Sequence, residues 1–239
     1  TDSWKTPGNF TALLKKQTAA RSDACCTETV DPTQYLWFTT LDNAYASIMS
    51  SQKKKVTPSF FAHAVLKTSR FEKMVKYWKT LLNADIAHQD AMFCFMTYDD
   101  EHHRLAIVSV PGLKDNQGQT AGLDHLAYTY ASMDDLISTY ERLKAAGIEP
   151  GWCINHGPTL SLYYKDPDGS RAELQIDLFS NSDQANEFIA SDAFVENPIG
   201  IKFEPEVLFG RYQSGETLEA LTVRRPLRQG ESFFDHLNS

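Results

Sequence analysis

His63 and His125 occupy nearly the same place in two similar segments of the chain, each in a predicted first strand shortly before a helix begins. A single strand histidine is more often a packed core residue than a ligand. Two histidines at equivalent positions of a repeat would face one shared cup if the two segments pair about a pseudo-twofold axis. This placement favours a role as metal ligands.

Glu173 is the third candidate ligand. In the strand predicted over residues 171–179, apolar and polar residues alternate, so one face is apolar and the other carries Glu173. That polar face could meet solvent. If the strand instead closes a cup, the carboxylate turns inward and needs a partner. A divalent metal would be that partner, and two imidazoles with one carboxylate leave positions open for substrate and O₂, as in non-haem Fe(II) oxygenases.

The elements that must position these residues form one pattern written twice. The first copy is predicted as a helix opened by Ser69, with Glu72 completing a capping box, and as strands over residues 60–68, 86–89, 92–98 and 102–110. The second copy is predicted as a helix capped by Ser132 and ended by Gly147, and as strands over residues 123–130, 149–154, 160–165 and 171–179. A turn at Asp166–Gly169 separates the last two strands.

The order βαβββ, repeated, predicts an α+β fold in which the modules 59–112 and 121–180 form one domain, residues 59–180. One copy cannot cover both faces of its sheet, so two should pair into a cupped mixed sheet with helices outside. Residues 1–58 are expected to be an N-terminal extension. Residues 181–239 are expected to be a C-terminal arm packed on the domain, with a short helix near residues 185–189 and an irregular stretch over 197–225.

Three segments resemble the vicinal oxygen chelate superfamily: Ala62–Val65, Gly122–Ala127 and Asp166–Glu173. This superfamily includes glyoxalase I, fosfomycin and bleomycin resistance proteins, and type I extradiol ring-cleaving dioxygenases. The resemblance covers residues 58–180 and implies the glyoxalase/bleomycin resistance/dioxygenase fold. It maps the superfamily's metal ligands onto His63, His125 and Glu173.

Four more residues favour the extradiol branch. The segment containing His102 and His103 is similar to the His-His-x-x-Ala strand of the extradiol enzymes, which implies that His103 is the acid–base residue. His156 and Tyr163 match a histidine and a tyrosine that flank the bound diol in that family. His156 lies two residues nearer to Tyr163 than the family pattern, so its loop must be shorter. The alternative that His102, His103 and Tyr163 are ordinary strand residues stays open.

These residue types suit the chemistry. A catechol must lose protons to chelate a metal through adjacent oxygens, and histidine can take a proton near neutral pH and return it. A tyrosine hydroxyl can donate a hydrogen bond to a developing oxygen anion. Phe203, Phe209 and Tyr212 in the C-terminal arm are further candidates for contact with the substrate.

Composition limits the function classes. The net charge of −8 argues against nonspecific nucleic-acid binding. There is no run of 18 apolar residues and no signal-peptide pattern, so no membrane association is expected. Four cysteines without CxxC spacing favour a reduced, cytoplasmic environment.

The sequence therefore predicts a one-domain extradiol dioxygenase, similar to those acting on 2,3-dihydroxybiphenyl, with Fe(II) as cofactor and an aromatic diol and O₂ as substrates. The added flanks favour a bicyclic or natural-product diol. A metal-dependent isomerase or glutathione-type transferase using Mn, Zn or Ni is the alternative, and a non-catalytic binding module is a third. A homodimer is common for this fold, although nothing in the sequence demands one.

Overall fold

The computed structural model describes residues 55–116 and 121–237. The chain divides into two units, residues 1–59 and 60–239, and the elements named below lie in the second. Nearly all of the predicted N-terminal extension lies outside the described residues. Within the described part of the chain, no helix is both long and apolar enough to cross a membrane.

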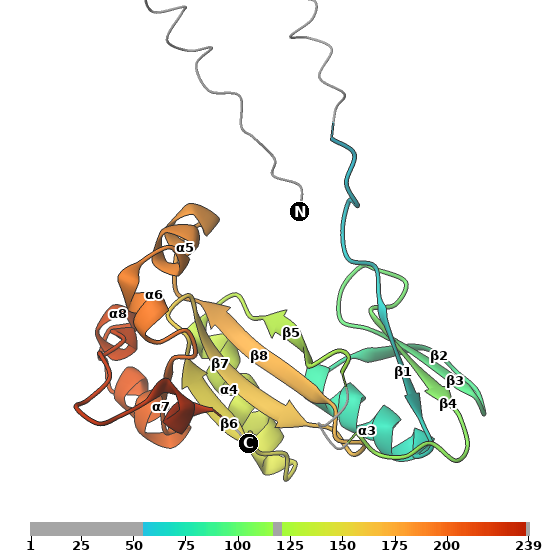
Figure 1. Ribbon diagram of the computed structural model, residues 1–239. Helices are drawn as coiled ribbons and strands as arrows, with labels where there is room; N and C mark the ends of the chain where they lie inside the picture. Colours follow the sequence, from blue (N-terminus) through green and yellow to red (C-terminus); the bar gives the residue numbers. More distant parts are fainter. Residues whose placement is uncertain (1–54, 117–120, 238–239) are drawn as a thin grey trace, which may run out of the picture. The chain divides into compact units, whose positions relative to one another are not determined.

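The first module is a four-stranded sheet with one helix (Figure 1). In the order β1-β4-β3-β2, β1 runs parallel to β4 and the other neighbours are antiparallel. The elements in chain order are β1 (Ala64–Thr68), α3 (Phe71–Leu82), β2 (Asp85–Gln89), β3 (Phe93–Thr97) and β4 (Leu105–Ser109).

Helix α3 begins two residues after the predicted cap. Arg70 is its N-cap residue and makes no side-chain capping bond. The Thr68 hydroxyl accepts from the Arg70 N–H at 2.8 Å, and Ser69 Oγ donates to the Leu113 carbonyl at 3.2 Å. The predicted capping box at Ser69 is therefore wrong, because a tertiary contact takes the hydroxyl that would have capped the helix.

The second module repeats the first and gains one strand. Its sheet has the order β5-β8-β7-β6-β9, with β5 parallel to β8. Ser132 accepts from the Asp135 N–H, and Gly147 follows the helix with φ of 73°, so both predicted helix boundaries are confirmed. The elements are β5 (His125–Thr129), α4 (Met133–Ala145), β6 (Trp152–Asn155), β7 (Thr159–Lys165) and β8 (Arg171–Asp177).

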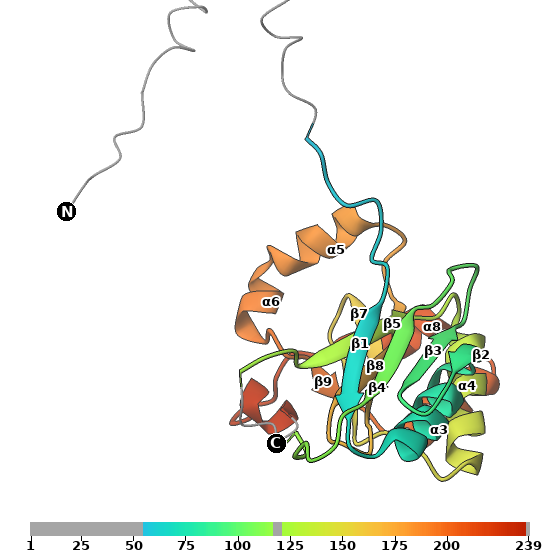
Figure 2. The ribbon, with the colours of Figure 1, turned by 90° about the vertical axis from the view of Figure 1, so that its right-hand side faces the viewer.

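The two modules pack on one shared core, which confirms the predicted α+β fold of paired βαβββ units. Their strands form two separately hydrogen-bonded sheets. Helices α3 and α4 lie side by side (Figure 2), and Arg142 of α4 donates to the Leu81 carbonyl at 3.3 Å. Trp78 Nε1 of α3 donates to Asp166 in the β7–β8 turn at 3.2 Å. Polar side chains thus fix one module against the other around an apolar centre.

The C-terminal arm is more regular than predicted. The helix near residues 185–189 is confirmed, but residues 197–225 are not irregular, because Pro205 stands in the first turn of a helix, where its fixed φ is favourable. The arm contains α5 (Ser182–Ile189), α6 (Asp192–Glu196), β9 (Ile201–Lys202), α7 (Pro205–Gln213), α8 (Leu218–Thr222) and a final 3₁₀ helix (Phe233–His236). Strand β9 pairs with β6 and so extends the second sheet.

Candidate active site

His125 and Glu173 meet on neighbouring parallel strands. Ala127 of β5 pairs with Glu173 of β8, so His125, two residues earlier, projects from the same face as the carboxylate. His125 Nε2 lies 2.9 Å from Glu173 Oε2. Glu173 is only 4% exposed, which excludes the solvent-facing alternative for this residue. The polar face of β8 therefore points inward at Glu173, as predicted, and places a buried carboxylate beside an imidazole.

Asp124 holds the other side of the same imidazole. Its Oδ2 lies 2.6 Å from His125 Nδ1, and Arg171 of β8 donates to both Asp124 oxygens at 2.5 Å. The hydrogen bond from His125, followed by that from Arg171, lowers the pKa of the Asp124 carboxyl. Sequence reasoning missed Asp124 as a site residue. The available signal was an acidic residue directly before a strand histidine, with an arginine at the start of the adjacent strand.

Tyr163 and His156 complete this side of the site. Tyr163 of β7 pairs directly with Glu173 of β8. The Tyr163 hydroxyl lies 3.0 Å from His156 Nε2, which is 4.0 Å from Glu173 Oε1. Burial, and then the Glu173 carboxylate, raise the pKa of Tyr163, so its phenol stays a hydrogen-bond donor at neutral pH. Burial lowers the pKa of His156, which favours the neutral imidazole.

The other three candidate histidines, His63, His102 and His103, gather at the first module. His63 comes directly before β1, and its ring centroid lies 4.4 Å from that of His103. His103 stacks on Phe95 of β3 at 4.8 Å, and its Nδ1 lies 2.6 Å from that of His102. His102 and His103 stand before β4, in the connection from β3, because the strand begins at Leu105 and not at residue 102 as predicted.

Comparison with known proteins identifies the family. The model of the Glyoxalase/Bleomycin resistance protein/Dioxygenase superfamily matches residues 60–174. A biphenyl-2,3-diol 1,2-dioxygenase of Rhodococcus globerulus is 42% identical over 168 residues, which is 70% of this chain and 88% of the relative. The chain belongs to this superfamily.

Two further relatives refine the superfamily assignment. A second biphenyl-2,3-diol 1,2-dioxygenase of Rhodococcus globerulus is 38% identical over 71% of this chain and 90% of its own length. A manganese-dependent 2,3-dihydroxybiphenyl 1,2-dioxygenase of Geobacillus genomosp. 3 is 24% identical over 51% of this chain and 43% of its own length. These relatives confirm the prediction of a ring-cleaving dioxygenase within the vicinal oxygen chelate superfamily.

The His125–Glu173 pair has the donor chemistry that a divalent metal needs in this superfamily. A buried carboxylate faces an imidazole nitrogen, and the opposite nitrogen is bound by a second carboxylate, which orients the ring. Across residues 55–116 and 121–237, no three His, Cys, Asp or Glu side chains are grouped closely enough to hold a metal ion. The role of His63 as third ligand therefore stays a prediction.

A hollow of about 300 Å³ lies where strand β1 of one module faces strand β5 of the other. Its lining includes His125, Asp124 and Arg171 of the second module and Val65 and Lys67 of β1. Its volume is at the lower end of the range for small-molecule sites. The imidazole of the His125–Glu173 pair thus borders a space to which both modules contribute.

The three aromatic residues suggested as substrate contacts pack elsewhere. Phe209 of α7 is 4% exposed and contacts Tyr140 of α4 with ring centroids 5.2 Å apart. Phe203 and Tyr212 are partly buried against the same core. Aromatic content alone could not distinguish a pocket wall from the anchor of a terminal helix, and here the residues anchor α7.

Proposed function

We propose that this protein is an Fe(II)-dependent extradiol dioxygenase that opens the ring of a vicinal aromatic diol with O₂. The observation that carries the proposal is the buried Glu173 carboxylate, 2.9 Å from His125 Nε2 and directly opposite Tyr163 in the β7–β8 register. The carboxylate and the imidazole come from separate strands and could serve as metal ligands. The neutral phenol beside them could donate a hydrogen bond to a diol chelated by that metal.

His63, His125 and Glu173 would hold the metal. When bound, it would draw the two diol oxygens and O₂ together and stabilise the negative charge that develops on them. Iron fits two imidazoles and one carboxylate with open positions. The manganese-dependent relative makes manganese the competing metal.

The protein side chains would transfer protons to and from the substrate and would orient it. Tyr163 would donate its O–H to an oxygen anion of the substrate, and His156 Nε2 would face the same region. His103 would take a proton from a diol hydroxyl and return it later, with His102 beside it. Phe95, stacked on His103, would keep that ring in place.

The relatives and the segments that flank the domain support a two-ring aromatic diol as the substrate. A diol on a two-ring aromatic such as biphenyl-2,3-diol is the first compound to test, because two relatives at 42% and 38% identity bear that substrate in their names. We further place the protein in the cytoplasm, as its cysteine pattern suggests. A homodimer stays a prediction.

The test is metal analysis together with O₂ uptake on anaerobically prepared full-length protein. We expect stoichiometric iron and uptake of one O₂ per biphenyl-2,3-diol opened, with both lost in His125→Ala and Glu173→Gln. His88→Ala is the matched control, because His88 is exposed and pairs with Asp90. Turnover of any substrate under nitrogen, with Mn, Zn or Ni in place of iron, would support the isomerase or transferase alternative instead.

The same experiment tests His63 as the third metal ligand. His63→Ala should abolish iron binding as completely as His125→Ala. Full iron occupancy in His63→Ala would remove His63 from the ligand set while leaving the His125–Glu173 pair in place. Retention of tight diol binding by a metal-free His63→Ala/His125→Ala protein would favour a binding module over an enzyme.

A further inference from the structure

One residue of the candidate site is held by the C-terminal arm through a backbone carbonyl. His156 Nδ1 lies 2.5 Å from the carbonyl oxygen of Ile199. A carbonyl oxygen can only accept a hydrogen bond, so Nδ1 must carry the proton. In the neutral imidazole the other nitrogen, Nε2, is then an acceptor, and it lies 3.0 Å from the Tyr163 hydroxyl. The arm therefore specifies which nitrogen of His156 faces the site without a proton.

The Ile199 carbonyl is fixed by a closed turn around one buried side chain. Asn197 is 4% exposed, and its Oδ1 accepts from the N–H groups of Ile199 at 3.2 Å and Gly200 at 2.8 Å. Its Nδ2 donates to the Gly200 carbonyl at 2.9 Å. One amide side chain thus satisfies three backbone groups of the same turn. The direction of the Ile199 carbonyl is set by Asn197.

Arg224 ties this turn to the histidine. One guanidinium nitrogen donates to the His156 carbonyl at 2.9 Å, and another donates to the Asn197 carbonyl. The guanidinium also lies over the ring of Phe188, 5.3 Å from its centroid. A single side chain therefore bridges the two backbone segments whose separation determines the His156–Ile199 hydrogen bond.

Two glycines allow the arm to approach this closely. Gly200 has φ of 122°, and a Cβ there would stand 2.3 Å from the Asn155 carbonyl oxygen. Gly157, with φ of 103°, packs under Phe188, where a Cβ would meet the ring at 2.4 Å. The Gly200 contact is backbone against backbone and the Gly157 contact is backbone against the Phe188 ring, and the positive φ disfavours a side chain at both points. The His156 turn is enclosed by the arm on both sides.

We propose that the C-terminal arm selects the Nδ1–H tautomer of His156, with Asn197 and Arg224 as positioning residues, so that Nε2 can accept from Tyr163 or from a diol hydroxyl. The second half of this statement rests on the proposed function. With the opposite tautomer, Nε2–H would donate to the Tyr163 oxygen, and the Tyr163 O–H would turn to the Glu173 carboxylate. The hydroxyl of a bound diol would then find no acceptor at this position.

The test reads the tautomer directly. In full-length protein with ¹⁵N-labelled histidine, NMR should show His156 with a protonated Nδ1 and an unprotonated Nε2. Asn197→Ala should produce a mixture of tautomers. Asn197→Asp keeps an acceptor oxygen for the Ile199 and Gly200 N–H groups but loses the Nδ2 donor to the Gly200 carbonyl, so it should restore the wild-type signal only in part. Asn181→Ala is the matched control, because Asn181 caps α5 in the same arm through Gln184 N and should leave the signal unchanged.

Turnover measurements connect the tautomer to the reaction. We expect Asn197→Ala to lower kcat by about tenfold, below the roughly 10²–10⁴-fold of a complete acid–base contribution, with a smaller change in KM. Asn197→Asp should recover part of that loss. If Asn197→Ala fails to fold, Arg224→Gln is the second variant. It removes the hydrogen bonds from Arg224 to the His156 and Asn197 carbonyls and leaves those of the Asn197 side chain in place, and the same mixture of tautomers is expected.

The outcomes separate the two proposals. A wild-type tautomer that persists in Asn197→Ala and in Arg224→Gln overturns the positioning role, even if the protein opens diols. A mixed tautomer in these variants, in a protein that opens no diol, supports the positioning role and removes the proposed reaction. A wild-type His156 protonated at Nε2 overturns the inference at once.

Discussion

Asp124 Oδ2 lies 2.6 Å from His125 Nδ1, the ring nitrogen opposite the one that faces Glu173. The chain has therefore placed one carboxylate on each side of a single imidazole, one from the residue before it and one from the neighbouring strand. Arg171 holds Asp124 in this position. An imidazole bound in this way cannot rotate, and its Nε2 is committed to one direction.

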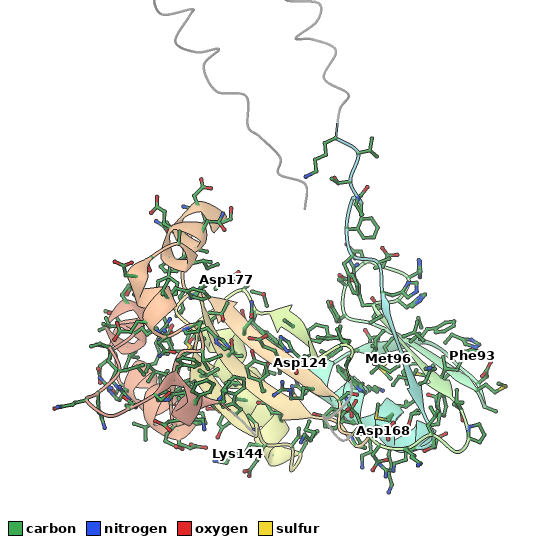
Figure 3. All side chains as sticks on the ribbon, viewed as in Figure 1. Phe93, Met96, Asp124, Lys144, Asp168 and Asp177 are labelled. Carbon is green, nitrogen blue, oxygen red and sulfur yellow. The ribbon has the colours of Figure 1, made fainter. Side chains whose placement is uncertain are left out.

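Asp124→Asn should weaken metal binding by about 10–100-fold, the usual effect of losing a carboxylate partner of a ligating histidine. The neutral amide would accept a weaker hydrogen bond from His125 Nδ1 and would no longer form an ion pair with Arg171. Competition with a chelator of known affinity measures the change. Asp177→Asn is a suitable control, because Asp177 is exposed at the far end of β8 (Figure 3). Equal metal affinity in both variants would show that Asp124 has no part in the site.

Tyr163→Phe should lower kcat by roughly 10²-fold while leaving metal content unchanged, because it removes one donor to the developing oxygen anion. Tyr164→Phe is the matched control on the opposite face of β7. The Tyr164 hydroxyl is buried with no hydrogen-bond partner in the described part of the chain, so its removal should be neutral or slightly stabilising. Steady-state O₂ uptake compares the two, and an equal kcat in both would exclude the Tyr163 role.

The C-terminal arm should lose stability in acid through Glu231. Hydrogen bonds from Arg225, and then from the Arg228 backbone N–H, lower the pKa of Glu231 from 4.5 to about 2. Because the folded pKa lies below the ordinary value, the ionised carboxylate stabilises the fold above pH 4.5, and this contribution is lost as the pH falls toward 2. Thermal melts from pH 7 to 2 should show a shallower acid decline for Glu231→Gln than for wild type. Parallel declines would contradict this assignment.

The shared core should be sensitive to truncation at its centre. Leu136 of α4 is fully buried, and Leu136→Ala should cost about 2–5 kcal/mol through lost burial and the cavity left behind. Chemical denaturation measures the free energy of unfolding. Ile189→Ala in α5 serves for comparison, because Ile189 is 48% exposed and should change stability by less than about 0.5 kcal/mol.

The repeat could be predicted from sequence because each element carries its own local signal. Ser132, Gly147 and the Asp166–Gly169 turn mark boundaries through short-range hydrogen bonds and backbone freedom, and all three are confirmed. Ser69 failed because its hydroxyl bonds to Leu113, 44 residues away. A contact of that range is invisible to a local pattern.

The candidate site also combines features that could be predicted from the sequence with features that could not. The meeting of His125, Glu173 and Tyr163 was foreseeable from strand alternation and the order of the strands. Asp124 carried a signal that was missed, because an acidic residue directly precedes a strand histidine. The Ile199 carbonyl carried none, because it is a backbone group that every residue type shares. A pattern of side chains cannot indicate which carbonyl will face a histidine.

Strand β9 has a consequence for shortened forms of this protein. It contributes only Ile201 and Lys202, yet it covers the outer edge of β6 and places a positive charge beside it. A chain cut before residue 200 would leave the outer edge of β6 at Ile154 and Asn155 unpaired, although β7 would still pair with its inner edge. Such an open edge recruits strands from other molecules. Removing the arm would therefore promote edge-to-edge aggregation.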